Sequence, residues 1–206
     1  MKLIKKGAEA DIYLASWNGQ TSILKIRKKK EYRIDSLDQR IRTLRTIREA
    51  RLISESKSFG ITTPIVYFVD ERKCMIYLQL IHGKLVKDLP PKKIITISTE
   101  IGKLIGTLHK NGIMHGDLTT SNFILSKNRL VILDFGLAQK TDKIDDYAID
   151  LRLFKEVLNS AHVQIMEDAW SSFVNGYRIM LGTHVTEKVV SQVSIIESRG
   201  RYANVI

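Results

Sequence analysis

The residues with the clearest potential for chemistry lie in two short segments of the chain. One is His-Gly-Asp-Leu-Thr-Thr-Ser-Asn at residues 115–122, and the other is Asp-Phe-Gly at residues 134–136. Asp117 is placed as a carboxylate that faces a nucleophile, while Asn122 and Asp134 offer the oxygen ligands that a divalent metal ion prefers. This combination is typical of a site that transfers a phosphoryl group, with a glycine that lets the backbone turn.

The segment between the two motifs should bring the metal ligands together. Two apolar, β-prone runs within residues 123–133 flank a polar, turn-like stretch at residues 126–129. We therefore expect a β-hairpin that returns Asp134 to the loop ending at Asn122. The alternative is a surface loop whose acids only cap turns. That is common for a single aspartate but does not account for the joint pattern.

A phosphoryl-transfer site also needs a cation for the nucleotide phosphates. Lys25 is the best candidate, because it lies in an apolar-flanked, strand-like run at residues 22–26. An Asn-Gly turn at residues 18–19 should join this strand to residues 10–15 as a hairpin. The alternative is that Lys25 is one exposed base among many.

An acid on a long helix should hold this lysine in place. We expect that acid to be Glu49, in the segment Arg-Glu-Ala-Arg at residues 48–51, with Glu55 as the second choice. Apolar residues recur every three to four positions along this segment, which predicts the helix. They are Leu37, Ile41, Leu44, Ile47 and Leu52.

The segment Lys-Gly-Ala-Glu-Ala at residues 6–10 is the candidate loop for the nucleotide phosphates. It carries one glycine instead of three, but its small alanines still permit close approach of the backbone. Adenine is expected near the end of the apolar run at residues 78–81, through backbone groups. The residues expected to bind the nucleotide are Gly7, Ala8, Glu9, Lys25, Gln79 and Ile81.

Together these motifs resemble the catalytic and magnesium-binding loops of the protein-kinase superfamily. Gly116 stands where most protein kinases have an arginine, which usually pairs with a phosphorylated activation loop. No Ala-Pro-Glu segment follows Gly136. The resemblance therefore implies a site that is not switched by loop phosphorylation and that lacks the usual peptide-docking platform. It also implies that Asp150 accepts hydrogen bonds from the backbone of the catalytic loop.

The combination of motifs further resembles the KEOPS-complex kinase, a small atypical serine/threonine kinase and ATPase related to the RIO kinases. The similarity runs from Lys5 to Arg201 and includes Arg-Gly-Arg at residues 199–201. It implies ATP and Mg²⁺ as cofactors, with ATP hydrolysis supporting threonylcarbamoyladenosine modification of tRNA and with autophosphorylation on serine or threonine. It also implies two protein partners, a threonylcarbamoyl-transferring metalloenzyme subunit and a small regulatory subunit.

Charge points independently to a nucleic acid partner. The formal net charge is +11, and residues 25–51 alone carry eleven Lys or Arg against four Asp or Glu. Such a cluster is suited to the phosphates of tRNA, and reversing Arg42 and Arg45 should weaken that binding. The basic C-terminal tail is the second expected contact. The alternative is a solvated helix face.

The expected fold is α+β, a minimal two-lobed protein-kinase-like domain. Residues 1–80 should form a β-rich N-lobe with one long helix, residues 81–83 a hinge, and residues 84–206 a reduced, mainly helical C-lobe. A helix should begin at Pro90-Pro91 and end at Asn111-Gly112, because proline favours the first helical turn and glycine the end. Its two glycines, at positions 102 and 106, should permit close helix packing.

Two other functions remain open from the sequence. Small-molecule kinases of the aminoglycoside or sugar phosphotransferase type also carry His-x-Asp-x-x-x-x-Asn, but the interval at residues 83–90 is short for their usual substrate-binding insertion. A nucleotide-binding scaffold is the non-enzymatic alternative, and intact Lys25, Asp117, Asn122 and Asp134 argue against it.

The sequence favours a cytoplasmic location without a membrane partner. The short basic N-terminus does not resemble a signal peptide, and no apolar stretch approaches the roughly 18 residues of a membrane span. The single cysteine, Cys74, lies in an apolar run and is expected to be a buried, reduced thiol.

Overall fold

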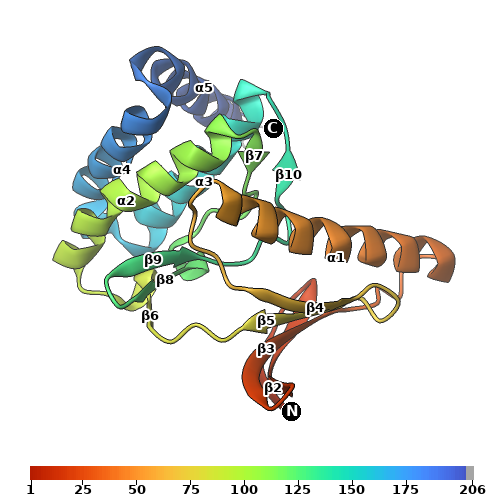
Figure 1. The fold of residues 1–206 in the computed structure, drawn as a ribbon. Coiled ribbons are helices and arrows are strands. Elements are labelled where there is room, and N and C mark those ends of the chain that lie inside the picture. The colour runs from red at the N-terminus through yellow and green to blue at the C-terminus, as the bar shows by residue number, and fades with distance from the viewer. Residues whose placement is uncertain (203–206) are drawn as a thin grey trace.

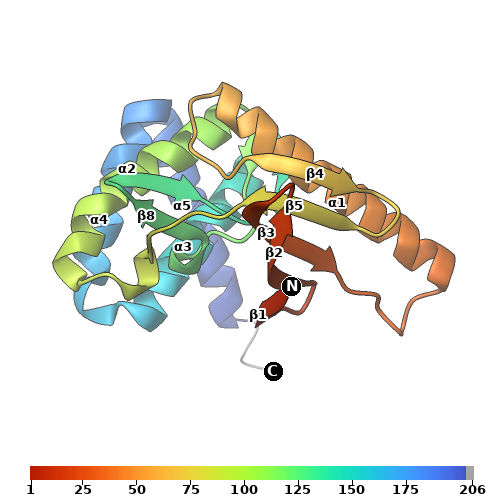
Figure 2. The same ribbon diagram turned by 60° about the horizontal axis from the view of Figure 1, so that its bottom comes forward.

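The first half of the chain contains a five-stranded antiparallel sheet with strand order β1-β2-β3-β5-β4. In this computed structural model, the backbone of residues 1–202 and the side chains of residues 1–199 are described. Helix α1 runs along one face of the sheet (Figures 1 and 2). The elements of this half are β1 (Lys2–Lys6), β2 (Ala10–Trp17), β3 (Gln20–Arg27), α1 (Asp35–Ser58), β4 (Val66–Asp70) and β5 (Met75–Gln79).

A two-residue turn fixes the register of the hairpin that carries Lys25. Asn18 and Gly19 form this turn, and both have positive φ, 47° and 79°. That geometry matches the right-handed twist of the flanking strands. The ladder places Lys25 opposite Ile12 on one neighbouring strand and Ile76 on the other. The expected hairpin is confirmed, and Lys25 lies on the central strand of the sheet.

The long helix expected to carry Glu49 is confirmed as α1, but three of the apolar residues that predicted it lie on its exposed side. Leu37, Leu44 and Ile47 are 49%, 52% and 36% exposed. The face that packs inward is mixed, with polar residues among the apolar ones: Asp38, Thr46, Glu49, Ala50, Leu52, Ile53 and Ser56. A helical period identifies a stripe of residues but not the side that turns inward. Here the inward side must deliver an acid to a polar cleft.

Helices dominate the second half of the chain, joined by short strands (Figure 1). The helix expected after Pro90 is confirmed, with Pro91 as its first residue and Gly112, at φ 69°, just beyond its end. The elements are β6 (Lys84–Leu85), η1 (Val86–Asp88), α2 (Pro91–Lys110), β7 (Ile113–Met114), η2 (Thr120–Asn122), β8 (Phe123–Ser126), β9 (Arg129–Ile132), β10 (Gln139–Lys140), α3 (Ile144–Ala161), η3 (Val163–Ile165), α4 (Met166–Leu181) and α5 (Thr183–Tyr202).

Glycines let α2 and α4 pack backbone to backbone. A Cβ atom added at Gly102 would lie 2.0 Å from the carbonyl oxygen of Phe173, and one at Gly176 would lie 1.9 Å from the carbonyl oxygen of Thr99. A Cβ at Gly106 would also meet α4, 3.1 Å from a carbonyl oxygen. The packing role expected for the α2 glycines is therefore confirmed, and α4 contributes a third glycine to the same contact.

We expect Gly176→Ala to lower the free energy of unfolding by about 1–3 kcal/mol through overpacking. Alanine favours a helix by up to about 1 kcal/mol over glycine, but the clash is with backbone and is relieved only by moving α2 away from α4. Urea unfolding measures the change. Ser171→Ala, at an exposed position of α4, is the control and should match the parent. A Gly176→Ala variant as stable as the parent would contradict the prediction.

The hairpin between the two motifs forms as expected but with a tighter turn. Lys127 and Asn128 make a two-residue turn with φ of 45° and 63°, while Ser126 pairs with Arg129 in the ladder between β8 and β9. Strand β10 was not expected. It pairs with β7, immediately before the catalytic loop, and so closes the segment after Asp-Phe-Gly onto that loop.

Candidate active site

The loop between β7 and β8 carries Asp117, and a buried acid of α3 holds its backbone. Asp150 is fully buried and accepts hydrogen bonds from the amides of His115 (2.5 Å) and Gly116 (2.7 Å). It also lies 3.2 Å from Nε2 of His109. Burial alone would raise the pKa of Asp150, but the His109 contact and the other donors outweigh burial, so the pKa lies below its ordinary value. An ionised carboxylate therefore fixes the loop.

Gly116 has a steric reason to be glycine. Its φ is 78°, in the left-handed region, and an added Cβ would lie 2.6 Å from the carbonyl oxygen of Leu137. An arginine at this position would require the loop to move. The absence of the usual arginine is therefore part of the loop geometry in this chain.

His115 connects the catalytic loop to the Asp-Phe-Gly segment. Its Nδ1 accepts a hydrogen bond from the amide of Asp117 at 3.3 Å, and its Nε2 lies 2.9 Å from the carbonyl oxygen of Leu133. Because a carbonyl oxygen only accepts, Nε2 carries the proton. The ring also packs 5.2 Å from that of Phe135. This arrangement couples the position of Asp117 to that of the second motif.

Asn122 and Asp117 form a pair within the loop. The Nδ2 atom of Asn122 donates to both the carbonyl oxygen and the Oδ2 atom of Asp117, at 2.8 Å each. With its nitrogen directed at Asp117, the amide keeps its oxygen available as a ligand. Asn122 is thus oriented by the same residue that is expected to face the nucleophile.

Lys25 joins the acid on α1 to the acid of the second motif. Its Nζ atom lies 2.6 Å from Oε1 of Glu49 and 2.6 Å from Oδ1 of Asp134. Burial disfavours the charged form of Lys25, but the attraction of Glu49 and Asp134 outweighs it, so the pKa of Lys25 is raised. The pKa of Asp134 is lowered, because Lys25 outweighs the effect of burial. Glu55, the second choice, instead pairs with Lys140.

Arg27 is a component of the site that the sequence analysis did not identify. It is 5% exposed, and its Nη2 atom lies 2.5 Å from Oε2 of Glu49. The available signal was the period of the strand, since Lys25 and Arg27 are two residues apart and share one face. Glu49 therefore receives one cation on each carboxylate oxygen.

Two adjoining cavities meet at Lys25 and Asp134. The first, about 280 Å³, is mostly apolar and includes the expected adenine-site residues Gln79 and Ile81. The second, about 390 Å³, includes Asp117 and the whole expected phosphate loop, Gly7, Ala8 and Glu9. The Gln79 side chain is already engaged, because its Oε1 accepts from the amide of Ile65 at 3.2 Å. The backbone amide of Gln79 also donates to the carbonyl oxygen of Ile65 at 2.8 Å, so Gln79 forms part of the cavity wall.

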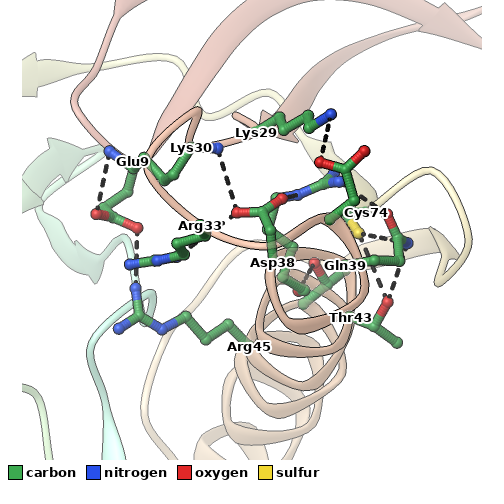
Figure 3. Close-up of polar contacts among 12 residues, drawn as sticks. Glu9, Lys29, Lys30, Arg33, Asp38, Gln39, Thr43, Arg45 and Cys74 are labelled. Carbon is green, nitrogen blue, oxygen red and sulfur yellow. Dashed lines mark hydrogen bonds and ion pairs between the residues drawn. The ribbon is translucent and has the colours of Figure 1, made fainter.

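Ion pairs anchor the phosphate loop to α1 (Figure 3). The Oε2 atom of Glu9 lies 2.8 Å from Nη1 of Arg45, and its Oε1 atom lies 3.4 Å from Nζ of Lys30. Lys30 also donates to the carbonyl oxygen of Ala8 at 2.7 Å. A free carboxylate beside nucleotide phosphates would repel them, and these cations neutralise it. Gly7 is needed for the tight turn, because its added Cβ would lie 2.4 Å from the carbonyl oxygen of Ala10.

Comparison with known proteins agrees with this geometry. The protein kinase domain family matches residues 1–201. The KEOPS complex subunit Bud32 of Pyrococcus abyssi is 40% identical, over 98% of this chain and 96% of the relative. The chain belongs to the Bud32 family of the protein kinase superfamily. A probable bifunctional tRNA threonylcarbamoyladenosine biosynthesis protein of Methanococcus maripaludis is 40% identical over 97% of this chain, which spans 36% of that longer relative.

Solved structures confirm the protein-kinase-like fold of this Bud32-family chain. The Rio2 kinase of Chaetomium thermophilum, solved in an ADP/Mg²⁺-phosphoaspartate complex, gives a TM-score of 0.63 at 14% identity, covering 99% of this chain and 72% of the other. WaaP, solved with acyl carrier protein, gives a TM-score of 0.63 at 13% identity, covering 98% and 88%. The expected α+β fold and the resemblance to the KEOPS-complex kinase are thus confirmed. The chain is a phosphotransferase of the kinase or ATPase type.

The basic surface of this Bud32-family chain is smaller than its sequence suggests. Arg42 pairs with the buried carboxylate of Asp38 at 2.6 Å, and Arg45 pairs with Glu9 (Figure 3). Both arginines are partly exposed and make ion pairs within the protein, and their expected contact with tRNA stays a prediction. Exposed arginines of α1 remain on its outer side, at positions 40, 48 and 51.

The structure describes only part of the C-terminal tail. The basic tail expected to contact tRNA falls largely on residues 200–206, of which the structure describes no side chain and no backbone beyond residue 202. Within the part that is described, none of the helices is long and apolar enough to cross a membrane.

Proposed function

We propose that this chain is an ATP-dependent kinase and ATPase that acts within a KEOPS complex to support threonylcarbamoyladenosine modification of tRNA. The observation that carries the proposal is the convergence of Lys25, Asp117, Asn122 and Asp134 on one pair of adjoining cavities. The similarity to Bud32 over almost the whole of both chains supports the complex and the pathway. The names of the relatives support this function over a small-molecule phosphotransferase.

The side chains divide the work of phosphoryl transfer. Asp117 would orient the attacking oxygen and accept its proton, and Lys25, fixed by Glu49, would balance the charge of the phosphates. Asn122 and Asp134 fit a divalent cation, because an amide oxygen and an ionised carboxylate are ligands that Mg²⁺ accepts. When bound, Mg²⁺ supplies charge neutralisation at the terminal phosphates. Adenine would occupy the apolar cavity beside residues 81–83, which we propose as the hinge.

The segment after Asp-Phe-Gly favours a small acceptor or water over an extended peptide. Only residues 137–143 separate the motif from α3, and two of them form β10, which pairs back to β7. This leaves little chain for a peptide-docking platform. We therefore propose ATP hydrolysis and autophosphorylation on serine or threonine, rather than action on a dedicated protein substrate.

Nucleotide binding in the presence of Mg²⁺ tests the assigned ligands. Asp134→Ala should weaken the affinity for Mg²⁺-ADP by about 10-fold or more, because it removes both a metal ligand and a partner of Lys25. Fluorescence titration with and without Mg²⁺ measures the change. The affinity measured without Mg²⁺ should change less. Equal affinities of parent and variant in the presence of Mg²⁺ would refute the assignment of Asp134.

Binding of tRNA tests the outer side of α1. Replacing Arg40, Arg48 and Arg51 by glutamate should weaken tRNA binding and reduce its salt dependence, by about 0.7–0.9 in slope for each phosphate group that the variant no longer neutralises. The matched control is Arg178→Glu, at an exposed position of α4. A parental affinity and salt slope in the triple variant would exclude this surface.

The partner subunits follow from the same reasoning. The bifunctional relatives contain a long additional region beyond the part that this chain matches. From the similarity to a KEOPS complex subunit, we propose that this chain acts with a threonylcarbamoyl-transferring metalloenzyme subunit and a small regulatory subunit. Affinity purification of this chain from its native cell, followed by tRNA nucleoside analysis, tests both the complex and the pathway.

A further inference from the structure

Glu49 is shared by two cations of the same strand. Oε1 lies 2.6 Å from Nζ of Lys25, and Oε2 lies 2.5 Å from Nη2 of Arg27. Side chains alternate along a strand, so residues 25 and 27 of β3 both face α1 and the cleft. The acid that fixes the expected catalytic lysine therefore has a second anchor, which belongs to the sheet and not to any mobile segment.

Arg27 also contacts the backbone of α1. Its Nη2 atom lies 3.4 Å from the carbonyl oxygen of Arg45, one helical turn before Glu49. Both contacts are made by this one nitrogen, which lies at the end of a side chain longer than that of lysine. The Arg27 side chain is only 4% exposed, so these contacts are made out of water. Arg27 thus links β3 to both the side chain and the backbone of the helix.

Arg27 also contributes to the charge balance of the site. The cluster contains two acids, Glu49 and Asp134, and two bases, Lys25 and Arg27. Only the Glu49 carboxylate is deeply buried, at 1% exposed, whereas the Asp134 side chain is 44% exposed. Without Arg27, one ammonium group would serve both carboxylates, and a buried acid that loses a partner is costly.

Lys25 has to share its ammonium group when a nucleotide binds. This group contacts Glu49 and Asp134 at 2.6 Å each, so a phosphate oxygen must compete with one of them. We propose that Arg27 is a positioning residue that holds Glu49 by its second carboxylate oxygen, and α1 in place, so that Lys25 keeps its contact with Glu49 and exchanges Asp134 for a nucleotide phosphate. This inference rests on the proposed use of ATP at the site. It gives the chain an internal substitute for the phosphorylation-dependent alignment that Gly116 excludes.

Steady-state ATP turnover with Mg²⁺ provides the first test. Arg27→Met should lower kcat by about 10- to 100-fold, the range for losing a hydrogen bond to a buried charge. Arg27→Lys should recover part of the loss, because it keeps the charge. Combining Arg27→Met with Glu49→Gln should be no slower than Glu49→Gln alone, since both changes interrupt one interaction. The control Arg178→Met, exposed on α4, should keep the parental kcat.

Two kinetic results would overturn the proposal. One is a parental kcat in Arg27→Met. The other is an independent loss in the double variant, with the two effects multiplying, which would mean that Arg27 acts directly on the phosphates. Arg27 lines the cavity of about 390 Å³ together with Lys25 and Asp117, so this direct contact is the specific competitor.

Hydrogen exchange separates failure of this inference from failure of the proposed function, because it needs no turnover. Without nucleotide, the α1 amides near residues 45–53 should exchange faster in Arg27→Met than in Arg178→Met. Equal exchange rates in the two variants would show that Arg27 does not stabilise α1. A parent with no ATP turnover, together with faster exchange in Arg27→Met, would instead refute the proposed function and support the anchoring role.

If Arg27→Met does not fold, Arg27→Lys can be used for both the ATP turnover test and the hydrogen-exchange test. A single ammonium group should hold Glu49 but contact the Arg45 carbonyl oxygen poorly. We then expect intermediate exchange of α1 and a kcat lowered by about 3- to 10-fold. Parental exchange and parental kcat in a folded Arg27→Lys variant would overturn the proposal.

Discussion

We expect Asp117→Asn to lower ATP turnover by about 10²–10⁴-fold, the usual contribution of a positioned proton acceptor. The loss should appear in kcat, with nucleotide affinity close to that of the parent, because Asp117 is placed to face the attacking oxygen and not the adenine cavity. The change keeps the size of the side chain, so the contact with Asn122 is altered without leaving a cavity. Radiolabelled ATP turnover and nucleotide titration measure the two effects separately.

The matched control for this prediction is Asp168→Asn. Asp168 is exposed on α4, away from the catalytic loop, and its replacement removes the same charge. The control should turn over ATP at the parental rate. Survival of turnover in Asp117→Asn would show that the assigned loop does not carry the chemistry. Loss of nucleotide binding along with turnover would instead show that Asp117 shapes the pocket.

Asp150→Ala should lower the free energy of unfolding by about 3–5 kcal/mol, as expected when one partner of a buried polar cluster is removed. The substitution leaves the amides of His115 and Gly116 and the ring of His109 without their acceptor. The catalytic loop should lose its order, so turnover should fall even in molecules that stay folded. Urea unfolding and ATP turnover test both effects. A variant with parental stability would show that the loop does not need this carboxylate.

The pH dependence of stability gives a second measure of Asp150. Its pKa in the folded protein lies below the ordinary value of 3.8, because the His109 contact and the amide donors outweigh burial. Its stabilising contribution is therefore complete above about pH 3.8 and is lost as the pH falls through the folded-state pKa. The parent should lose stability in acid more steeply than Asp150→Ala, because the variant has no such group to titrate. The pKa of Asp134 is also lowered, but this group is present in both the parent and Asp150→Ala, so the difference between their pH profiles reports on Asp150.

The sequence was sufficient for features with strong local signals. The Asn18-Gly19 turn fixes a hairpin register on its own, and Pro91 and Gly112 bound a helix by their backbone preferences. The pairing of Lys25 with Glu49 followed from the kinase-like motifs, and the structure brings these residues together. Each of these expectations depended on a short stretch of chain or on a motif with fixed spacing.

Features that depend on three-dimensional context were missed or misassigned. The helical period did not indicate which side of α1 faces inward, and Leu37 and Leu44 lie exposed because the helix serves a polar cleft as well as the core. Arg42 and Arg45 looked like free basic residues, since their acids lie four residues away in one case and on another element in the other. Arg27 looked like the start of a basic run until β3 was seen to turn it inward.

The left-handed backbone at Gly116 has a consequence for how such an enzyme can be controlled. A phosphate-sensing arginine cannot be introduced there by one substitution, because the first carbon of its side chain would collide with the Leu137 carbonyl before any guanidinium formed a contact. Control through a phosphate-sensing arginine at this position is therefore excluded by backbone shape alone. Other molecules, such as those that occupy the cleft or dock on the outer side of the long helix, are left as the means of switching.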